Sequence, residues 1–105
     1  MCRRATGGPY AVLAWFRGAD LCWSGEAPVC RRSSSIATRG FCSRCGTPLF
    51  LAYDDSDQIA VMVGVIDDPA AFIPSHHYGC ESRLPWVDAG RALPSRPTAD
   101  DPRPR

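Results

Sequence analysis

Residues 41–50 read Phe-Cys-Ser-Arg-Cys-Gly-Thr-Pro-Leu-Phe. Two cysteines with two residues between them and a glycine directly after are typical of a zinc knuckle, because the tight turn directs both sulfurs toward one ion. Such a pair supplies half of a tetrahedral ligand set. The sequence leaves open a redox pair, a half-site completed from outside the chain, or part of a longer protein, because the other cysteines lie singly at Cys2, Cys22, Cys30 and Cys80.

Composition predicts a single small domain. The chain has 105 residues, of which 45% are hydrophobic, and this is enough for one modest core. A formal net charge of +1 argues against bulk electrostatic binding of nucleic acid or of an anionic membrane. No apolar run reaches the roughly 20 residues of a membrane span and no signal segment is present, so we expect a cytoplasmic protein that does not bind membranes.

A cytoplasmic location favours metal binding over redox chemistry for the knuckle. Thiols stay reduced there, and close cysteine pairs are then metal-binding or redox-active. A thioredoxin-like pair would begin a helix, whereas Cys45 leads into Gly46 and a strand-like segment. We therefore expect Cys42 and Cys45 to bind zinc, and we expect the isolated Cys22, Cys30 and Cys80 to be small apolar fillers within strands.

The remaining pattern predicts an all-β fold. Apolar, β-branched and aromatic runs indicate strands over residues 10–17, 29–39, 49–53, 59–66 and 76–81. Asp54-Asp55-Ser56-Asp57 suits a hairpin turn, and Asp67-Asp68-Pro69 suits a turn that opens a short helical turn. The proline-rich residues 95–105 are expected to be disordered.

Short motifs along the chain follow a recognisable order. They are Cys2-Arg3-Arg4, Phe16-Arg17-Gly18, Trp23-Ser24-Gly25-Glu26, Ser34-Ser35, Arg39-Gly40-Phe41-Cys42, Cys45-Gly46, Gly64, Asp67-Asp68-Pro69, His77 and Pro85-Trp86. This order resembles the glutathione-dependent formaldehyde-activating family, whose eukaryotic relatives include centromere protein V. The resemblance runs from Cys2 to about Pro94 and implies a β-tent fold of antiparallel sheets, with residues 1–94 forming a partial zinc-binding domain.

The resemblance also implies two Zn²⁺ sites. In the family, a structural zinc is bound by an N-terminal Cys-x-Cys pair together with the knuckle, which Cys42 and Cys45 match. A reactive zinc is bound by a Cys-x-Cys-x-x-Cys cluster, of which Cys2 matches the last cysteine. The other ligands and the N-terminal strands have no counterpart here, so we expect a truncated chain with exposed sheet edges, and the reading frame upstream of Met1 would distinguish a misassigned start from a real truncation.

The activity that the resemblance implies is that of a carbon-sulfur lyase. It joins glutathione, the expected small thiol partner, to formaldehyde, or releases both from S-hydroxymethylglutathione. Cys2 would be the remnant of the reactive zinc site, and the expected substrate-binding residues are Ser35, Arg39, His77 and Trp86. The alternatives are a non-catalytic zinc-binding or protein-interaction module and an inactive gene fragment, and a homodimer could combine two half-sites.

Those substrate-binding residues also have structural interpretations. Ser35 and Arg39 would share one face of an extended strand, where Arg39 binds either a substrate carboxylate through paired donors or a loop carbonyl. His77 lines the pocket or is a surface residue. Trp86 is expected to cover the core or a cavity, and Glu26 is available to pair with an arginine.

Overall fold

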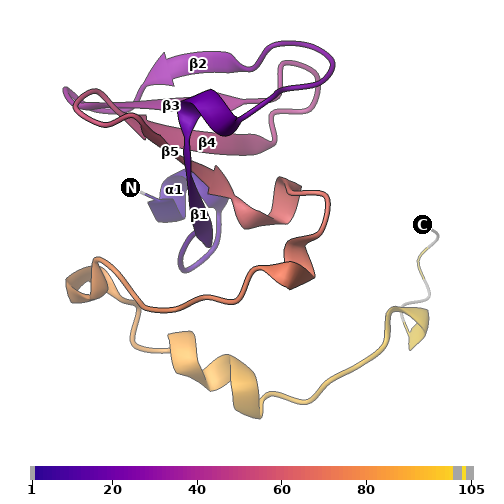
Figure 1. Cartoon of the computed structure of the whole chain (residues 1–105). Helices are drawn as coiled ribbons and strands as arrows, with labels where there is room; N and C mark the ends of the chain where they lie inside the picture. The colour runs from indigo at the N-terminus through magenta and orange to yellow at the C-terminus, as the bar shows by residue number, and fades with distance from the viewer. Residues whose placement is uncertain (1, 101–102, 104–105) are drawn as a thin grey trace.

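The computed structural model describes residues 2–100 and 103 (Figure 1). Five strands form one antiparallel sheet with the spatial order β1-β5-β4-β3-β2. They are β1 (Leu13–Arg17), β2 (Val29–Arg32), β3 (Ala37–Phe41), β4 (Pro48–Tyr53) and β5 (Gln58–Met62). The short α-helix α1 (Cys2–Thr6) precedes them, and the expected all-β fold is confirmed.

One row of cross-strand partners runs over the whole sheet. Trp15 pairs with Ala60, Ala60 with Leu51, Leu51 with Arg39, and Arg39 with Arg31. Directly opposed residues of neighbouring strands present their side chains to the same face. Along this row the face is therefore apolar on β1, β5 and β4 and carries two arginines on β3 and β2.

The hydrophobic core lies on the apolar part of that face. Ala37, Leu51 and Ala60 are buried, and Leu13 and Tyr53 pack against them. The side chains at its centre are mostly small, so the area that this core removes from water is modest.

The opposite face holds the connecting segments in place through aromatic contacts. The ring of Phe50 lies directly on Gly40, where a Cβ atom would overlap it. Trp23 packs on Phe50 with ring centroids 5.6 Å apart, and Phe72 meets Phe16 edge to face at 6.0 Å. Both loops, residues 21–28 and 66–72, are thereby fixed against the sheet.

The predicted strand over residues 29–39 is wrong, because the chain reverses within it. Residues 33–36 form the turn of a hairpin between β2 and β3, in which the Ser33 N–H donates to the Ala37 carbonyl at 3.0 Å. The Ser34 hydroxyl accepts the Ile36 N–H at 3.3 Å. Serine side chains that bond to nearby backbone groups favour turns over strands, and this explains the reversal.

Of the other predicted elements, some are present in the structure and one is not. The predicted strands over residues 10–17, 49–53 and 59–66 overlap β1, β4 and β5, although β4 and β5 each begin one residue earlier and Val63–Val65 forms a 3₁₀ turn, η2. The helical turn after Asp68 is confirmed as η3 (Pro69–Ala71). The predicted strand over residues 76–81 is wrong, since the turn η4 (Cys80–Ser82) begins there and the preceding residues have no regular structure.

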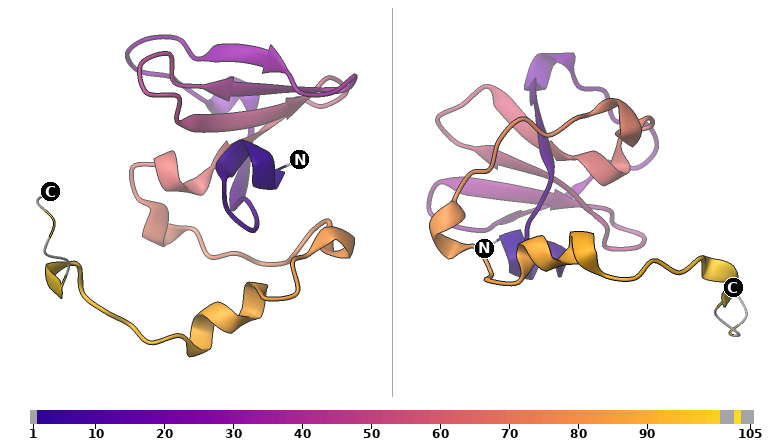
Figure 2. Two further views of the ribbon diagram at one scale, coloured as in Figure 1. Left: turned by 180° about the vertical axis from the view of Figure 1, so that it is seen from behind. Right: turned by 90° about the horizontal axis from the view of Figure 1, so that it is seen from below.

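Residues 73–100 form a C-terminal segment that passes outside the sheet (Figures 1 and 2). Its regular structure is limited to η4, η5 (Val87–Ala92) and η6 (Thr98–Asp100). The radius of gyration is 15.9 Å, above the roughly 13 Å of a compact domain of this length. The expected disorder of residues 95–105 stays a prediction, and its positions 101–102 and 104–105 lie outside the described residues.

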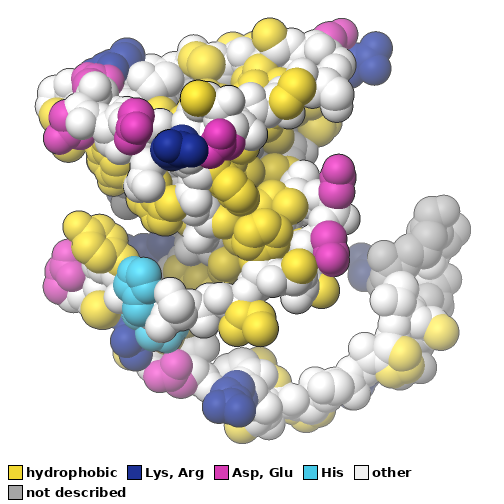
Figure 3. Space-filling view, viewed as in Figure 1, with side chains coloured by type: hydrophobic (Ala, Val, Ile, Leu, Met, Phe, Trp, Pro, Cys, Tyr) yellow, Lys and Arg dark blue, Asp and Glu magenta, His cyan; other side chains and the backbone are white. Residues whose placement is uncertain are grey.

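Exposure is high at one sheet edge and around the apolar face. Every residue of β2 is exposed, and Figure 3 shows hydrophobic side chains open to solvent between the sheet and the C-terminal segment. The expectation that Cys22, Cys30 and Cys80 are buried fillers is wrong, because all three are exposed. In the part of the chain that the structure describes, no helix is long and apolar enough to cross a membrane.

Candidate functional site

The knuckle forms the turn between β3 and β4. The Cys42 N–H donates to the Thr47 carbonyl and the Gly46 N–H donates to the Cys42 carbonyl, both at 2.9 Å. Gly46 has a φ of +76°, a left-handed conformation that a glycine adopts without steric cost. This local bonding holds Cys42 and Cys45 on one tight loop, as the sequence predicts.

Thr47 forms hydrogen bonds with one of the two knuckle thiols and lowers its pKa. The Cys45 sulfur lies 2.9 Å from the Thr47 hydroxyl oxygen. Hydrogen bonds from that hydroxyl, from the Thr47 backbone N–H and from the Cys42 thiol lower the pKa of Cys45 below its ordinary value. Because the thiolate is the form that binds zinc, this environment favours a ligand role for Cys45.

The knuckle nevertheless fits a zinc ion only in part. Among residues 2–100 and 103, no three His, Cys, Asp or Glu side chains gather closely enough to hold a metal. Cys42 and Cys45 therefore provide two positions of a tetrahedral site. At Cys2 a reactive zinc does not fit, because a guanidinium contacts its sulfur and the described residues form no group of metal ligands around it.

Arg39 is the most unusual side chain of the sheet. It is only 6% exposed, although arginine is almost never buried without a charged partner. One guanidinium nitrogen, Nη2, donates to the Cys2 sulfur at 3.6 Å, and the other, Nη1, is buried with no hydrogen-bond partner in the described part of the chain. Two of the residues that the sequence singles out, Cys2 and Arg39, are thus brought together.

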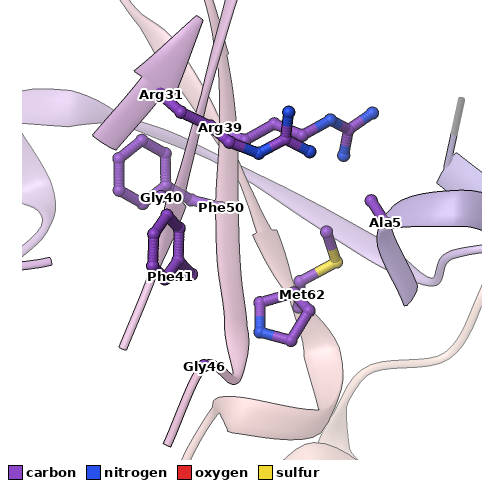
Figure 4. A pocket seen from close by; sticks show the side chains of 9 residues that line it. Ala5, Arg31, Arg39, Gly40, Phe41, Gly46, Phe50 and Met62 are labelled. Carbon is purple, nitrogen blue, oxygen red and sulfur yellow. The ribbon is translucent and has the colours of Figure 1, made fainter. Parts of the chain in front are cut away.

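A cavity of about 120 Å³ opens beside Arg39. In Figure 4 the guanidinium groups of Arg31 and Arg39 extend to the same side of the sheet, toward α1. The remaining lining consists of apolar side chains and glycine backbone, contributed by Ala5, Gly40, Phe41, Gly46, Pro48, Phe50 and Met62. Among the described residues, the charged groups that line this cavity are the two guanidinium groups.

The other predicted substrate-binding residues lie elsewhere. Ser35 is exposed in the β2–β3 turn, so the expectation that it shares a strand face with Arg39 is wrong. Its carbonyl accepts a hydrogen bond from Arg32 Nη2 at 2.7 Å. His77 is exposed, and Figure 3 places the histidine side chains on the surface. Neither Ser35 nor His77 lines the cavity beside Arg39.

Trp86 belongs to a second, more open pocket. It is 57% exposed and borders a space of about 470 Å³ between α1, the following loop and the C-terminal segment. The other lining residues are Arg3, Arg4, Gly7, Gly8, Pro9 and Leu84. Trp86 does not cover the cavity beside Arg39.

Sequence reasoning missed two residues of the site. Thr47 could have been found, because a hydroxyl two residues after a knuckle cysteine is within reach of its sulfur. Arg31 could not, because its position opposite Arg39 depends on the unrecognised β2–β3 hairpin. The expectation for Glu26 is confirmed, since its carboxylate accepts from the Ser43 hydroxyl at 2.7 Å and lies 3.5 Å from Arg44 Nε.

Comparison with known proteins agrees with the motif order. The family model described as glutathione-dependent formaldehyde-activating enzyme matches residues 1–82, which include the knuckle, Cys2 and Arg39. No significant match was found among curated proteins or among solved structures. Because the family model covers more than half of the chain, this protein belongs to the glutathione-dependent formaldehyde-activating enzyme family.

Proposed function

We propose that this domain binds glutathione and S-hydroxymethylglutathione and serves the carbon-sulfur lyase reaction that interconverts glutathione plus formaldehyde with their adduct. The family match over residues 1–82 is the observation that carries this proposal. In the forward direction, the thiol sulfur bonds to the formaldehyde carbon and the thiol proton ends on the former carbonyl oxygen. The lyase direction breaks that carbon-sulfur bond and returns the proton to sulfur.

Arg39 would support this reaction by stabilising negative charge on sulfur or oxygen. Its contact with the Cys2 sulfur supports the idea that a thiol can be placed against this guanidinium. A permanent cation in a water-poor site favours a thiolate nearby and an oxyanion in the adduct. We assign substrate contact to Arg39 and to the Trp86 pocket, while Ser35 and His77 would contact only the outer part of a larger ligand.

In this proposal, only the two knuckle cysteines would bind zinc. Zinc bound to thiols supplies Lewis acidity and structural stabilisation in proteins. Here Cys42 and Cys45 would hold two positions of such an ion, and a second copy of the chain could supply two more. Arg39 would position the bound thiol compound, and turnover would need a more complete zinc site than the knuckle provides.

Binding and turnover test the proposal separately. We expect glutathione and S-hydroxymethylglutathione to shift backbone NMR signals around Arg39, and we expect Arg39→Gln to abolish these shifts. For the monomeric 105-residue chain we expect no exchange between formaldehyde and glutathione above the spontaneous rate, because a catalytic zinc keeps about three protein ligands and the described residues form no such group.

Two outcomes would change this assignment. Clear acceleration that disappears in Cys2→Ser would show that one cysteine suffices for catalysis and would contradict the expected lack of turnover. Failure of both thiol compounds to bind would overturn the proposal.

The second candidate is a non-catalytic zinc-binding or protein-interaction module. The absence of a three-ligand cluster from the described residues favours it, as do exposed apolar side chains such as Trp15, Ile73 and Tyr78. Such a module would retain zinc at the knuckle and would bind neither glutathione nor its adduct.

A further inference from the structure

The guanidinium of Arg39 carries a charge that the described residues do not neutralise. Arginine stays protonated in proteins, so burial cannot remove its charge by deprotonation. Its Nη1 nitrogen is buried and has no partner among the described residues, and its Nη2 nitrogen donates to a thiol sulfur at 3.6 Å. An unsatisfied buried donor on a charged group is among the most unfavourable features that a folded protein can contain.

Arg31 increases this excess of positive charge. It lies directly opposite Arg39 on the neighbouring strand, and like charges in that position repel each other. Within the described chain, neither of these two arginines has a carboxylate partner, whereas four others do. Those four ion pairs are Arg17–Asp20, Arg32–Asp54, Arg44–Glu26 and Arg83–Asp88.

The cavity between these arginines and α1 has the size of a small anion. Its volume of about 120 Å³ corresponds to roughly four water molecules at about 30 Å³ each. A carboxylate group, sulfate or phosphate fits such a space, and a whole tripeptide does not. The two guanidinium groups supply hydrogen-bond donors on one side, and apolar side chains and glycine backbone form the rest of the lining.

We propose that Arg31 and Arg39 form a binding site for a small oxyanion. The planar guanidinium matches the paired oxygens of carboxylate, sulfate and phosphate, which accept two parallel hydrogen bonds from it. The anion satisfies Arg39 Nη1 and screens the repulsion between the two arginines. The site shares Arg39 with the function proposed above, but an inorganic anion with no thiol is sufficient to occupy it, so sulfate binding tests it separately.

The test is a titration with sodium sulfate at an ionic strength held constant with sodium chloride. The readouts are the melting temperature and the backbone NMR shifts of Ala5, Gly40 and Gly46, which line the cavity. We expect saturable shifts with sulfate, and we expect Arg31→Gln to weaken the apparent affinity about tenfold or more, as the loss of a charged hydrogen bond predicts. Sulfate also stabilises proteins nonspecifically, so the difference between the wild type and this variant is the quantity to compare.

Matched variants distinguish a specific anion site from the general effect of losing a positive charge. Arg17→Gln removes an exposed arginine with its own carboxylate partner and should titrate like the wild type. Arg39→Lys retains the positive charge but lacks the planar guanidinium with its paired N–H donors, so it should lose most of the affinity for sulfate. Arg31 is exposed, so Arg31→Gln is expected to fold even if a variant of the buried Arg39 does not. Identical sulfate titrations of the wild type and Arg31→Gln would overturn the proposal and leave the cavity to water.

Competition identifies the source of the anion. If glutathione displaces sulfate and its diethyl ester does not, the site binds a carboxylate of a larger ligand. If neither displaces sulfate, the site binds a free inorganic anion. Either result supports the oxyanion site, whereas failure of glutathione to displace sulfate would count against the thiol contact with Arg39 proposed above.

Discussion

At the scale of single residues, Arg32 and Arg39 show two different environments of an arginine on the sheet. Arg32 is exposed and binds Asp54 through both carboxylate oxygens, with nitrogen-oxygen distances of 2.6 and 2.8 Å. Its hydrogen bonds and charge lower the pKa of the Asp54 carboxyl. Arg39 on the next strand is buried and has no such partner among residues 2–100 and 103. The position on the sheet, and not the residue type, thus decides whether an arginine fastens a turn or faces a cavity.

The Arg32–Asp54 pair predicts a pH-dependent stability. Because the folded-state pKa of Asp54 is lowered, its contribution is fully present above the unfolded carboxyl pKa of about 4 and is lost as the pH falls through the lower folded value. We expect Asp54→Asn to reduce the melting temperature slightly at pH 7, and we expect the difference from the wild type to vanish near pH 2.

Asp55→Asn in the same turn is the control, because Asp55 forms no ion pair with the described residues. An equal loss for Asp54→Asn at pH 2 and pH 7 would show that the charge of the pair contributes nothing and that only the shape of the side chain matters.

At the scale of elements, the sequence was sufficient to predict a turn or strand whose own residues determine its conformation. The knuckle could be predicted because Cys42, Cys45 and Gly46 define their turn within a few residues. The strand β5 could be predicted because its apolar run is unbroken. The β2–β3 hairpin could not, since Val29–Arg32 and Ala37–Phe41 are compatible with one continuous strand until serine side chains bond to the intervening backbone.

That single missed turn also explains most of what was missed at the site. Pairing of Arg31 with Arg39 is a consequence of hairpin register, which no local pattern fixes. The same error placed Ser35 on a strand. The strand expected over residues 76–81 failed for another reason, because no neighbouring strand is available to pair with this segment where it runs outside the sheet.

Close packing between β3 and β4 gives a prediction for Gly40. The Phe50 ring occupies the place of a Cβ atom, so Gly40→Ala forces the ring or the strand to move. We expect a loss of about 1–3 kcal/mol in the free energy of unfolding, and a fall in melting temperature on the order of 10 °C. Thermal and urea denaturation measure both quantities.

Gly64→Ala provides the comparison, because among the described residues no atom beyond its own turn lies within 4 Å of the added methyl group and the backbone φ is not positive. That variant should change stability by less than about 1 kcal/mol in either direction. Equal effects of the two substitutions would mean that the contact between Gly40 and Phe50 does not constrain the sheet.

At the scale of the whole molecule, a small core is combined with a large exposed surface. The radius of gyration, the exposed edge strand β2 and the open apolar side chains all indicate that the sheet buries less area than a compact domain of this length. A metal ion or a second copy of the chain is the usual source of additional stability for such a domain. The knuckle connects both possibilities, because two thiols from each of two chains complete a tetrahedral zinc site.

Zinc content and oligomeric state should therefore change together. We expect the purified chain to retain well under one zinc per monomer after mild chelation, or to bind zinc as a dimer that shares Cys42 and Cys45, because two thiols alone do not hold the ion against water and competing ligands. Native mass spectrometry with elemental analysis measures both quantities at once.

Cys42→Ser should abolish the retained zinc and any dimer that depends on it. Cys22→Ser, which removes an exposed cysteine outside the knuckle, should change neither. Two tightly bound zinc ions in a monomer would contradict this view, since the described residues contain no three-ligand group to hold them.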